Sequence, residues 1–170
     1  FGHGRTLFEE QLLVPLVVKF PRSKWAGRDD YIDVSTVDLV PTILEAAGVS
    51  TAPLVLDGLP LTAAITGAPD TPREVFSEVN PAANASSPEV DWAALIVGPT
   101  KCLHSANRVD NLGREVPEWT YLQLGPELYE ERLLAGDAAA ARDCQRRLAR
   151  WLVEAQRART GSTQDGVGQE

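Results

Sequence analysis

The chain has 170 residues, of which 44% are hydrophobic and 24% charged, so it is long enough for one hydrophobic core and short for two. Lys and Arg number 16 against 24 Asp and Glu, which gives a formal net charge of −8. This acidic balance argues against a nucleic-acid binder, because phosphate binding depends on clustered Lys and Arg. No apolar run approaches the roughly 18 residues of a membrane-spanning helix, so we expect no transmembrane segment.

The start of the chain is unusual for a translated protein. The sequence contains no methionine, and its first residue is Phe1. Because translation begins at methionine, we expect the chain to be a processed or excerpted part of a longer protein. Part of the function is then expected to lie in residues that precede Phe1.

The first part of the chain has the pattern of an α/β domain. The run from Leu12 to Phe20 is apolar and rich in valine, which predicts a strand buried on both faces, as in a parallel sheet. Such a strand would leave an exposed apolar edge where its neighbours are missing, and the isolated chain is expected to aggregate. A helix is predicted from its N-cap, Asp38, with Ser35 as the alternative cap, to Gly48. Its apolar residues recur at helical spacing, so one face is expected to be buried. A short helix is predicted over 59–65.

The second part has the pattern of a small antiparallel sheet followed by a helix. Alternating apolar and polar residues predict a strand over 73–79, and two runs on either side of Gly98-Pro99 predict a hairpin. A further strand is predicted over 119–124. A helix is predicted from Ala138 to about Arg157, with an apolar stripe on one side and solvated arginines on the other.

The two cysteines, Cys102 and Cys144, stand 42 positions apart. Because cysteine packs as a small hydrophobic residue, we interpret them as two buried thiols. A disulfide stays open, and so does the cellular compartment, since spacing alone does not establish pairing. The absence of a Cys-x-x-Cys pair argues against a zinc site.

Few residues have a setting that points to chemistry. No Gly-x-Ser-x-Gly elbow and no Gly-rich phosphate loop occurs. Glu130 and Glu131 are interpreted as solvated, and His104, at the end of a predicted strand, as structural. His3 has a glycine on either side, so the backbone there can approach a ligand closely and the imidazole can donate a hydrogen bond to an anionic oxygen. A histidine in a surface loop is the alternative.

Six motifs follow one another between Gly2 and Leu152. They are FGHGRTLFEEQLLVPLVVKFP at 1–21, STVDLVPTILEAAGV at 35–49, DGLPL at 57–61, VFSEV at 75–79, VGPTKCL at 97–103 and YLQLGPELYEERLLAGD at 121–137. In kind and order they resemble the C-terminal part of sulfatases of the alkaline phosphatase superfamily. Leu13 and Gln123 depart from the pattern, since many relatives have Arg and Asp at these positions.

The resemblance implies a fold and a division into parts. Residues 1–70 would be the C-terminal part of the α/β catalytic domain, with a partial alkaline-phosphatase-like sheet. Residues 71–157 would form a small subdomain of antiparallel strands with a C-terminal helix. Residues 158–170 would be a disordered tail.

The resemblance also implies an activity. Sulfatases hydrolyse sulfate esters of small molecules or glycans with a formylglycine nucleophile and a divalent cation, usually Ca²⁺. Neither cysteine lies in the Cys/Ser-x-Pro/Ala-x-Arg motif of that nucleophile, and the family's cation ligands are not found. We therefore expect both in the missing part, and the chain alone to be inactive.

Two residues of this chain match positions near the active site of sulfatases. His3 matches a residue that contacts the sulfate, and Lys101 matches a lysine near the cleft, with a structural role as its alternative. The motifs hardly separate sulfate from phosphate. A phosphodiesterase or phosphonate monoester hydrolase of the same superfamily is therefore one alternative function, and a non-catalytic binding or structural module is another.

Overall fold

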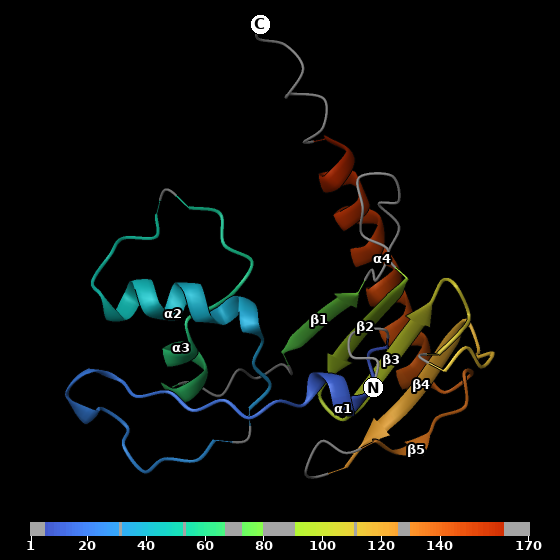
Figure 1. Cartoon of the computed structure of the whole chain (residues 1–170), viewed down its shortest axis with the longest axis horizontal. Helices are drawn as coiled ribbons and strands as arrows, with labels where there is room; N and C mark the ends of the chain where they lie inside the picture. Colours follow the sequence, from blue (N-terminus) through green and yellow to red (C-terminus); the bar gives the residue numbers. More distant parts are fainter. Residues whose placement is uncertain are drawn as a thin grey trace, which may run out of the picture. The chain divides into compact units, whose positions relative to one another are not determined.

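The computed structural model describes residues 6–30, 32–52, 54–66, 73–79, 91–110, 112–125 and 130–161. The protein is mixed α/β, with a five-stranded antiparallel sheet and a C-terminal helix (Figure 1). The chain divides into two compact units. The sheet unit consists of the residues up to Leu13 and those from Phe76 onward, and the helical unit is Val14–Val75.

The strands of the sheet are neighbours in chain order. They are β1 (Glu74–Val79), β2 (Trp92–Val97), β3 (Thr100–Ser105), β4 (Trp119–Leu124) and β5 (Glu130–Leu133). The predicted hairpin is confirmed as β2 and β3, and its turn contains Gly98 at φ 53°, a conformation that glycine adopts without steric cost. The predicted strands over 73–79 and 119–124 are confirmed as β1 and β4.

Strand β5 was not predicted, because its four residues, EERL, are too short and too charged to show an alternating pattern. It pairs with β4 from Leu122 opposite Leu133. The interpretation of Glu130 as a solvated acid is wrong, because its side chain lies largely under cover at the start of this strand.

Both faces of the sheet are covered. Side chains alternate along a strand, so that Lys101 and Leu103 of β3 lie on one face and Cys102 on the other. The first face packs against the opening segment, which includes the short helix α1 (Glu9–Leu12). The second face packs against α4 (Ala139–Gly161), which crosses β2 and β3 (Figure 1). The predicted apolar stripe of this helix is confirmed, since Ala141, Cys144 and Leu148 are buried.

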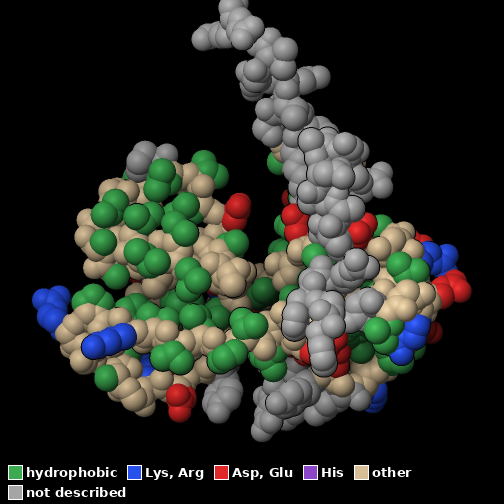
Figure 2. Space-filling view, in the orientation of Figure 1, with side chains coloured by type: hydrophobic (Ala, Val, Ile, Leu, Met, Phe, Trp, Pro, Cys, Tyr) green, Lys and Arg blue, Asp and Glu red, His purple; other side chains and the backbone are tan. Residues whose placement is uncertain are grey.

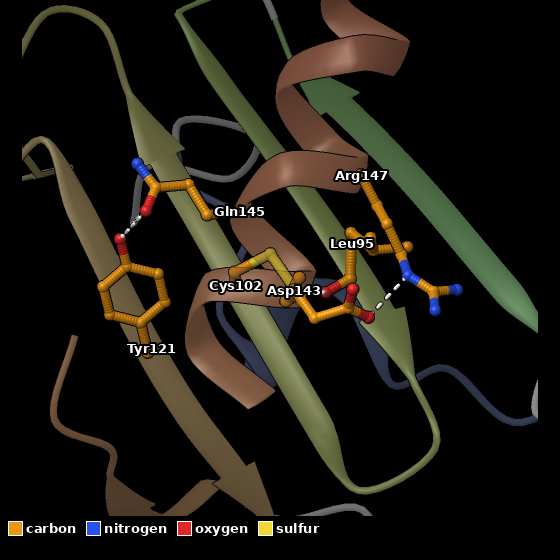
Figure 3. The surroundings of a disulfide bond; sticks show 7 residues. Leu95, Cys102, Tyr121, Asp143, Gln145 and Arg147 are labelled. Atoms are coloured by element: carbon orange, nitrogen blue, oxygen red, sulfur yellow. Dashed lines mark hydrogen bonds and ion pairs between the residues drawn. A yellow bond between two sulfur atoms is a disulfide. The ribbon is translucent and has the colours of Figure 1, made fainter. Parts of the chain in front are cut away.

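The two cysteines form a disulfide, so the interpretation of two buried thiols is wrong (Figure 3). Cys102 lies on the face of β3 that meets α4, and Cys144 lies at an inward position of that helix. Their Cα atoms are 6.0 Å apart, a usual distance for a disulfide. Their burial was predicted correctly, but their pairing depends on how α4 packs on the sheet.

The helical unit contains helices and irregular chain, and its described residues before Glu74 form no strand. Its elements are the 3₁₀ turns η1 (Pro21–Ser23) and η2 (Thr36–Asp38) and the helices α2 (Leu39–Ala46) and α3 (Leu61–Thr66). The predicted strand over Leu12 to Phe20 is therefore wrong: Leu12 ends α1, and the residues after it are irregular. A strand buried on both faces needs neighbouring strands and covering helices, and the described part of the chain supplies neither here.

The predicted exposure of this apolar segment is confirmed. Val14 and Val17 are 62% and 93% exposed, and Leu13, Leu16 and Val18 are exposed as well. Figure 2 shows hydrophobic side chains spread over the surface of the helical unit. Exposed apolar surface of this extent is typical of an interaction surface or of an aggregation site.

Helix α2 begins directly after Asp38, as predicted, and Gly48 follows its end at φ 69°. Asp38 makes no side-chain cap bond there, because the cap lies one turn earlier: Ser35, the alternative cap, forms a capping box with Asp38 at the start of η2. The predicted buried stripe is wrong, because Val40 and Ile43 are 53% and 65% exposed. The buried side of the helix instead carries Pro41 and Thr42.

No helix among the described residues combines the length and apolar character that crossing a bilayer requires.

We expect that replacing Val14 and Val17 together with lysine reduces self-association of the chain. Both side chains are exposed, so the change adds charge to the apolar segment without removing core contacts. Sedimentation velocity at several concentrations measures the effect. The matched control is Leu112→Lys, at a position that is 72% exposed in a loop of the sheet unit. Equal association of the wild type and the double variant would contradict the prediction.

Candidate functional site

The opening segment of the chain leads from His3 into α1. His3 itself lies outside the described residues, so its sulfate contact stays a prediction. Thr6 is buried, and Leu7 belongs to the core of the sheet unit. The contacts of this segment determine how the residues after His3 are held on the sheet.

A buried lysine and two carboxylates form the main charged cluster of the sheet unit. Lys101 Nζ lies 2.5 Å from Glu9 Oε1 and 2.8 Å from Glu130 Oε1. The Glu9 backbone N–H also donates to Glu130 Oε1, at 3.2 Å. Lys101 has no exposed side-chain surface, and the two glutamates are largely covered. We call these three residues the lysine cluster.

Three elements of the fold supply the lysine cluster. Lys101 comes from the middle of β3, Glu130 from the start of β5, and Glu9 from the first turn of α1. The N–H groups of a helix's first turn have no partner within the helix, and Glu130 accepts one of them. The cluster thereby holds the opening segment on the sheet. No local pattern indicates this cluster, because Glu9 and Glu130 lie 92 and 29 positions from Lys101 in the chain.

The contacts within the lysine cluster limit the roles that the Lys101 ammonium group can take. Burying an ammonium group away from water costs several kcal/mol unless anionic partners compensate, and here two carboxylates accept hydrogen bonds from it. Its ammonium is fully covered and faces these two partners. This arrangement favours the structural alternative for Lys101, as a residue that positions the opening segment. A substrate contact by Lys101 stays a prediction.

Two buried polar atoms on the same side of the sheet unit lack a hydrogen-bond partner within the described part of the chain. They are the hydroxyl of Thr6 and the indole N–H of Trp92. Trp92 belongs to the core cluster that also contains Leu7, the neighbour of Thr6. A buried polar group without a hydrogen-bond partner costs about 1–3 kcal/mol.

His104 lies on the other face of the sheet, away from the lysine cluster. Its ring is 4.7 Å from that of Trp119, and its Nε2 is 3.8 Å from Glu118 Oε1. Burial lowers the pKa of His104 below 6.5, and the nearby Glu118 only partly opposes this shift. A largely covered imidazole that favours its neutral form fits the predicted structural role.

A second buried charge holds the helical unit together. Asp38 is fully buried and accepts hydrogen bonds from Arg73 Nη2 at 2.5 Å, from the Ser35 N–H at 2.7 Å and from the Leu59 N–H at 2.9 Å. Burial tends to raise the pKa of Asp38, but these bonds outweigh it, and the pKa is lowered from 3.8. A Cβ on Gly58 would meet the Val37 carbonyl oxygen at 2.2 Å, so only glycine fits beside this site.

Among the ranges that the structure describes, no group of three or more His, Cys, Asp or Glu side chains is placed to hold a metal ion. The lysine cluster has two carboxylates, but the lysine between them already neutralises one charge. These residues therefore do not fit a calcium site.

A scan of the chain against protein-family models matches no family, and a search of curated proteins returns no significant match.

Proposed function

We propose that the chain is the C-terminal portion of a sulfatase-type hydrolase of the alkaline phosphatase superfamily. The intact enzyme hydrolyses the sulfate ester of a small molecule or glycan, with water as the second reactant and an alcohol and sulfate as products. In this proposal residues 1–70 complete the α/β catalytic domain, and the sheet with α4 is the small C-terminal subdomain.

The observation that carries the proposal is that residues from separate motifs meet in buried charged contacts. The lysine cluster joins the first, fifth and sixth motifs through Glu9, Lys101 and Glu130. Asp38 joins the second and third motifs through its bond with the Leu59 N–H. Five of the six motifs take part in these contacts, so the residues that carry the resemblance also hold each of the two units together.

The proposed part of His3 in catalysis is electrostatic. A cationic or hydrogen-bonding imidazole stabilises the negative charge that builds on the sulfate oxygens as the ester bond breaks. The lysine cluster supports His3 indirectly. It anchors Glu9, six residues after His3, to β3 and β5, and thereby fixes the segment that follows His3. Lys101 is in this view a positioning residue.

In the proposed enzyme, residues outside this chain provide the nucleophile and the ligands that bind the calcium ion. Cys102 and Cys144 are joined in a disulfide, so neither is available as a precursor of formylglycine. The exposed apolar segment after α1 and the exposed side of α2 provide a surface that the rest of an α/β domain would cover.

The test uses the product of the complete coding sequence, assayed with 4-nitrophenyl sulfate, bis(4-nitrophenyl) phosphate and 4-nitrophenyl phenylphosphonate. We expect the sulfate ester to be the best substrate, and a chelator to abolish its turnover. Preference for the phosphorus esters would replace the proposal with the phosphodiesterase alternative, and no turnover of any ester would favour the non-catalytic module. The isolated 170-residue chain is expected to show no turnover above background.

We expect that replacing His3 with alanine in the complete enzyme lowers kcat/KM for the sulfate ester by about 10²–10³-fold, the usual loss when one donor to a developing oxyanion is removed. The fall should appear mainly in kcat. The matched control is His104→Phe, which changes the other histidine of this chain. A His3→Ala enzyme with unchanged kcat/KM would contradict the assigned role.

A further inference from the structure

The disulfide lies between the sheet and α4 (Figure 3). Cys102 and Cys144 are fully buried, and they belong to a core cluster with Ala93, Leu95 and Leu148. No face of the bond is open to solvent. A soluble reductant or an exchanging thiol therefore reaches it only after α4 has separated from the sheet.

The disulfide links the apolar side of α4 to the apolar face of the sheet. Other contacts across this interface are the bond from the Tyr121 hydroxyl to Gln145 Oε1, at 2.8 Å, and the stacked rings of Phe76 and Trp151, 5.0 Å apart. The ion pair of Asp143 with Arg147 stays within the helix. The covalent bond adds a cross-link to the apolar packing between α4 and the sheet.

The surroundings of the bond are those of a structural cross-link. Cysteines that take part in redox cycles are partly exposed and have nearby cations that stabilise the thiolate. Here the side chains around the two cysteines are apolar and buried, and the Leu95 carbonyl oxygen lies 3.6 Å from Cys144 Sγ. While the sheet unit is folded, an attacking thiolate cannot reach this bond, so thiol–disulfide exchange does not occur.

We infer that this chain matures in an oxidising compartment, where the Cys102–Cys144 bond forms during folding and then persists. Forming it removes two protons and two electrons from the two thiols, and a thiol–disulfide oxidoreductase of such a compartment accepts the electrons. In a reducing cytosol the same pair would stay as two thiols. The inference stands on the disulfide and its burial, independently of the proposed enzymatic activity.

Trypsin provides a direct test. It cleaves after Lys101 and Arg108 and after Arg142 and Arg146, so each cysteine lies on a short peptide, 102–108 and 143–146. The protein is expressed from its complete coding sequence in its source organism, the cells are quenched with acid, and free thiols are alkylated before digestion. We expect mass spectrometry to find the two peptides joined. If both are found alkylated instead, the inference is overturned.

Thermal unfolding tests the structural role. We expect the double variant C102A/C144A to melt at least about 10 °C below the oxidised wild type, because the cross-link no longer restricts the unfolded chain. Adding a reductant should leave the melting temperature of the double variant unchanged, which controls for other effects of the reductant. A double variant that melts with the wild type would overturn the structural role. Should it fail to fold, the peptide analysis still decides whether the bond forms in the cell.

Discussion

Replacing Lys101 with methionine is expected to lower the free energy of unfolding of the sheet unit by about 3–5 kcal/mol, the usual loss when one partner of a buried ion pair is removed. Methionine keeps most of the volume of lysine, so the loss reports charge rather than packing. Glu9 and Glu130 would then face one another across a covered space without the cation that both contact. Urea unfolding followed by circular dichroism measures the change.

Two further variants test whether the loss of stability comes from the unpaired carboxylates. The triple variant K101M/E9Q/E130Q should recover part of the loss, because neutral side chains remove the repulsion between the two carboxylates. Lys19→Met, at an exposed lysine, should change the free energy of unfolding by no more than about 0.5 kcal/mol. A K101M protein within about 1 kcal/mol of the wild type would show that the cluster does not hold the opening segment.

Replacing Asp38 with asparagine is expected to destabilise the N-terminal end of α2 by about 3 kcal/mol. The amide removes the charge that faces Arg73, and it can present only one oxygen to the three donors that Asp38 serves. Hydrogen exchange of the α2 amides should accelerate by about two orders of magnitude, since local opening governs their exchange. Asp57→Asn, at an exposed acid of the same unit, is the control and should leave the exchange unchanged.

The lowered pKa of Asp38 adds a pH dependence to this prediction. The ionised carboxylate is favoured in the folded state, so its contribution is complete above the unfolded pKa of 3.8 and is lost as the pH falls through the lower folded value. Protection of the α2 amides in the wild type should decrease over that acidic range. The D38N variant should lack this component of the decrease, and equal pH profiles would contradict the assignment.

Elements whose pattern is local could be predicted from the sequence. The β2–β3 hairpin follows from two apolar runs around Gly98-Pro99, and α4 follows from a one-sided stripe of 3.6 periodicity. The capping box of Ser35 and Asp38 before α2 was among the alternatives that the sequence offered, because capping involves neighbours in the chain. In each case the physical cause of the element lies within a few residues.

Features that depend on distant contacts could not be predicted in this way. An apolar run such as Leu12 to Phe20 becomes a strand only beside other strands, and here its neighbours in the described structure supply none. The partners of Lys101 come from α1 and β5, and the partner of Cys102 comes from α4. The exposed side of α2 has the same explanation, since periodicity indicates an apolar face but not what covers it.

The disulfide also determines what a single proteolytic cleavage does to the chain. Residues 102 to 144 form a closed covalent ring that includes most of β3, all of β4 and β5, and the start of α4. A protease that cleaves one peptide bond inside the ring opens it without releasing a fragment. The clipped protein therefore migrates as two pieces on a gel only after its sulfur bridge has been broken.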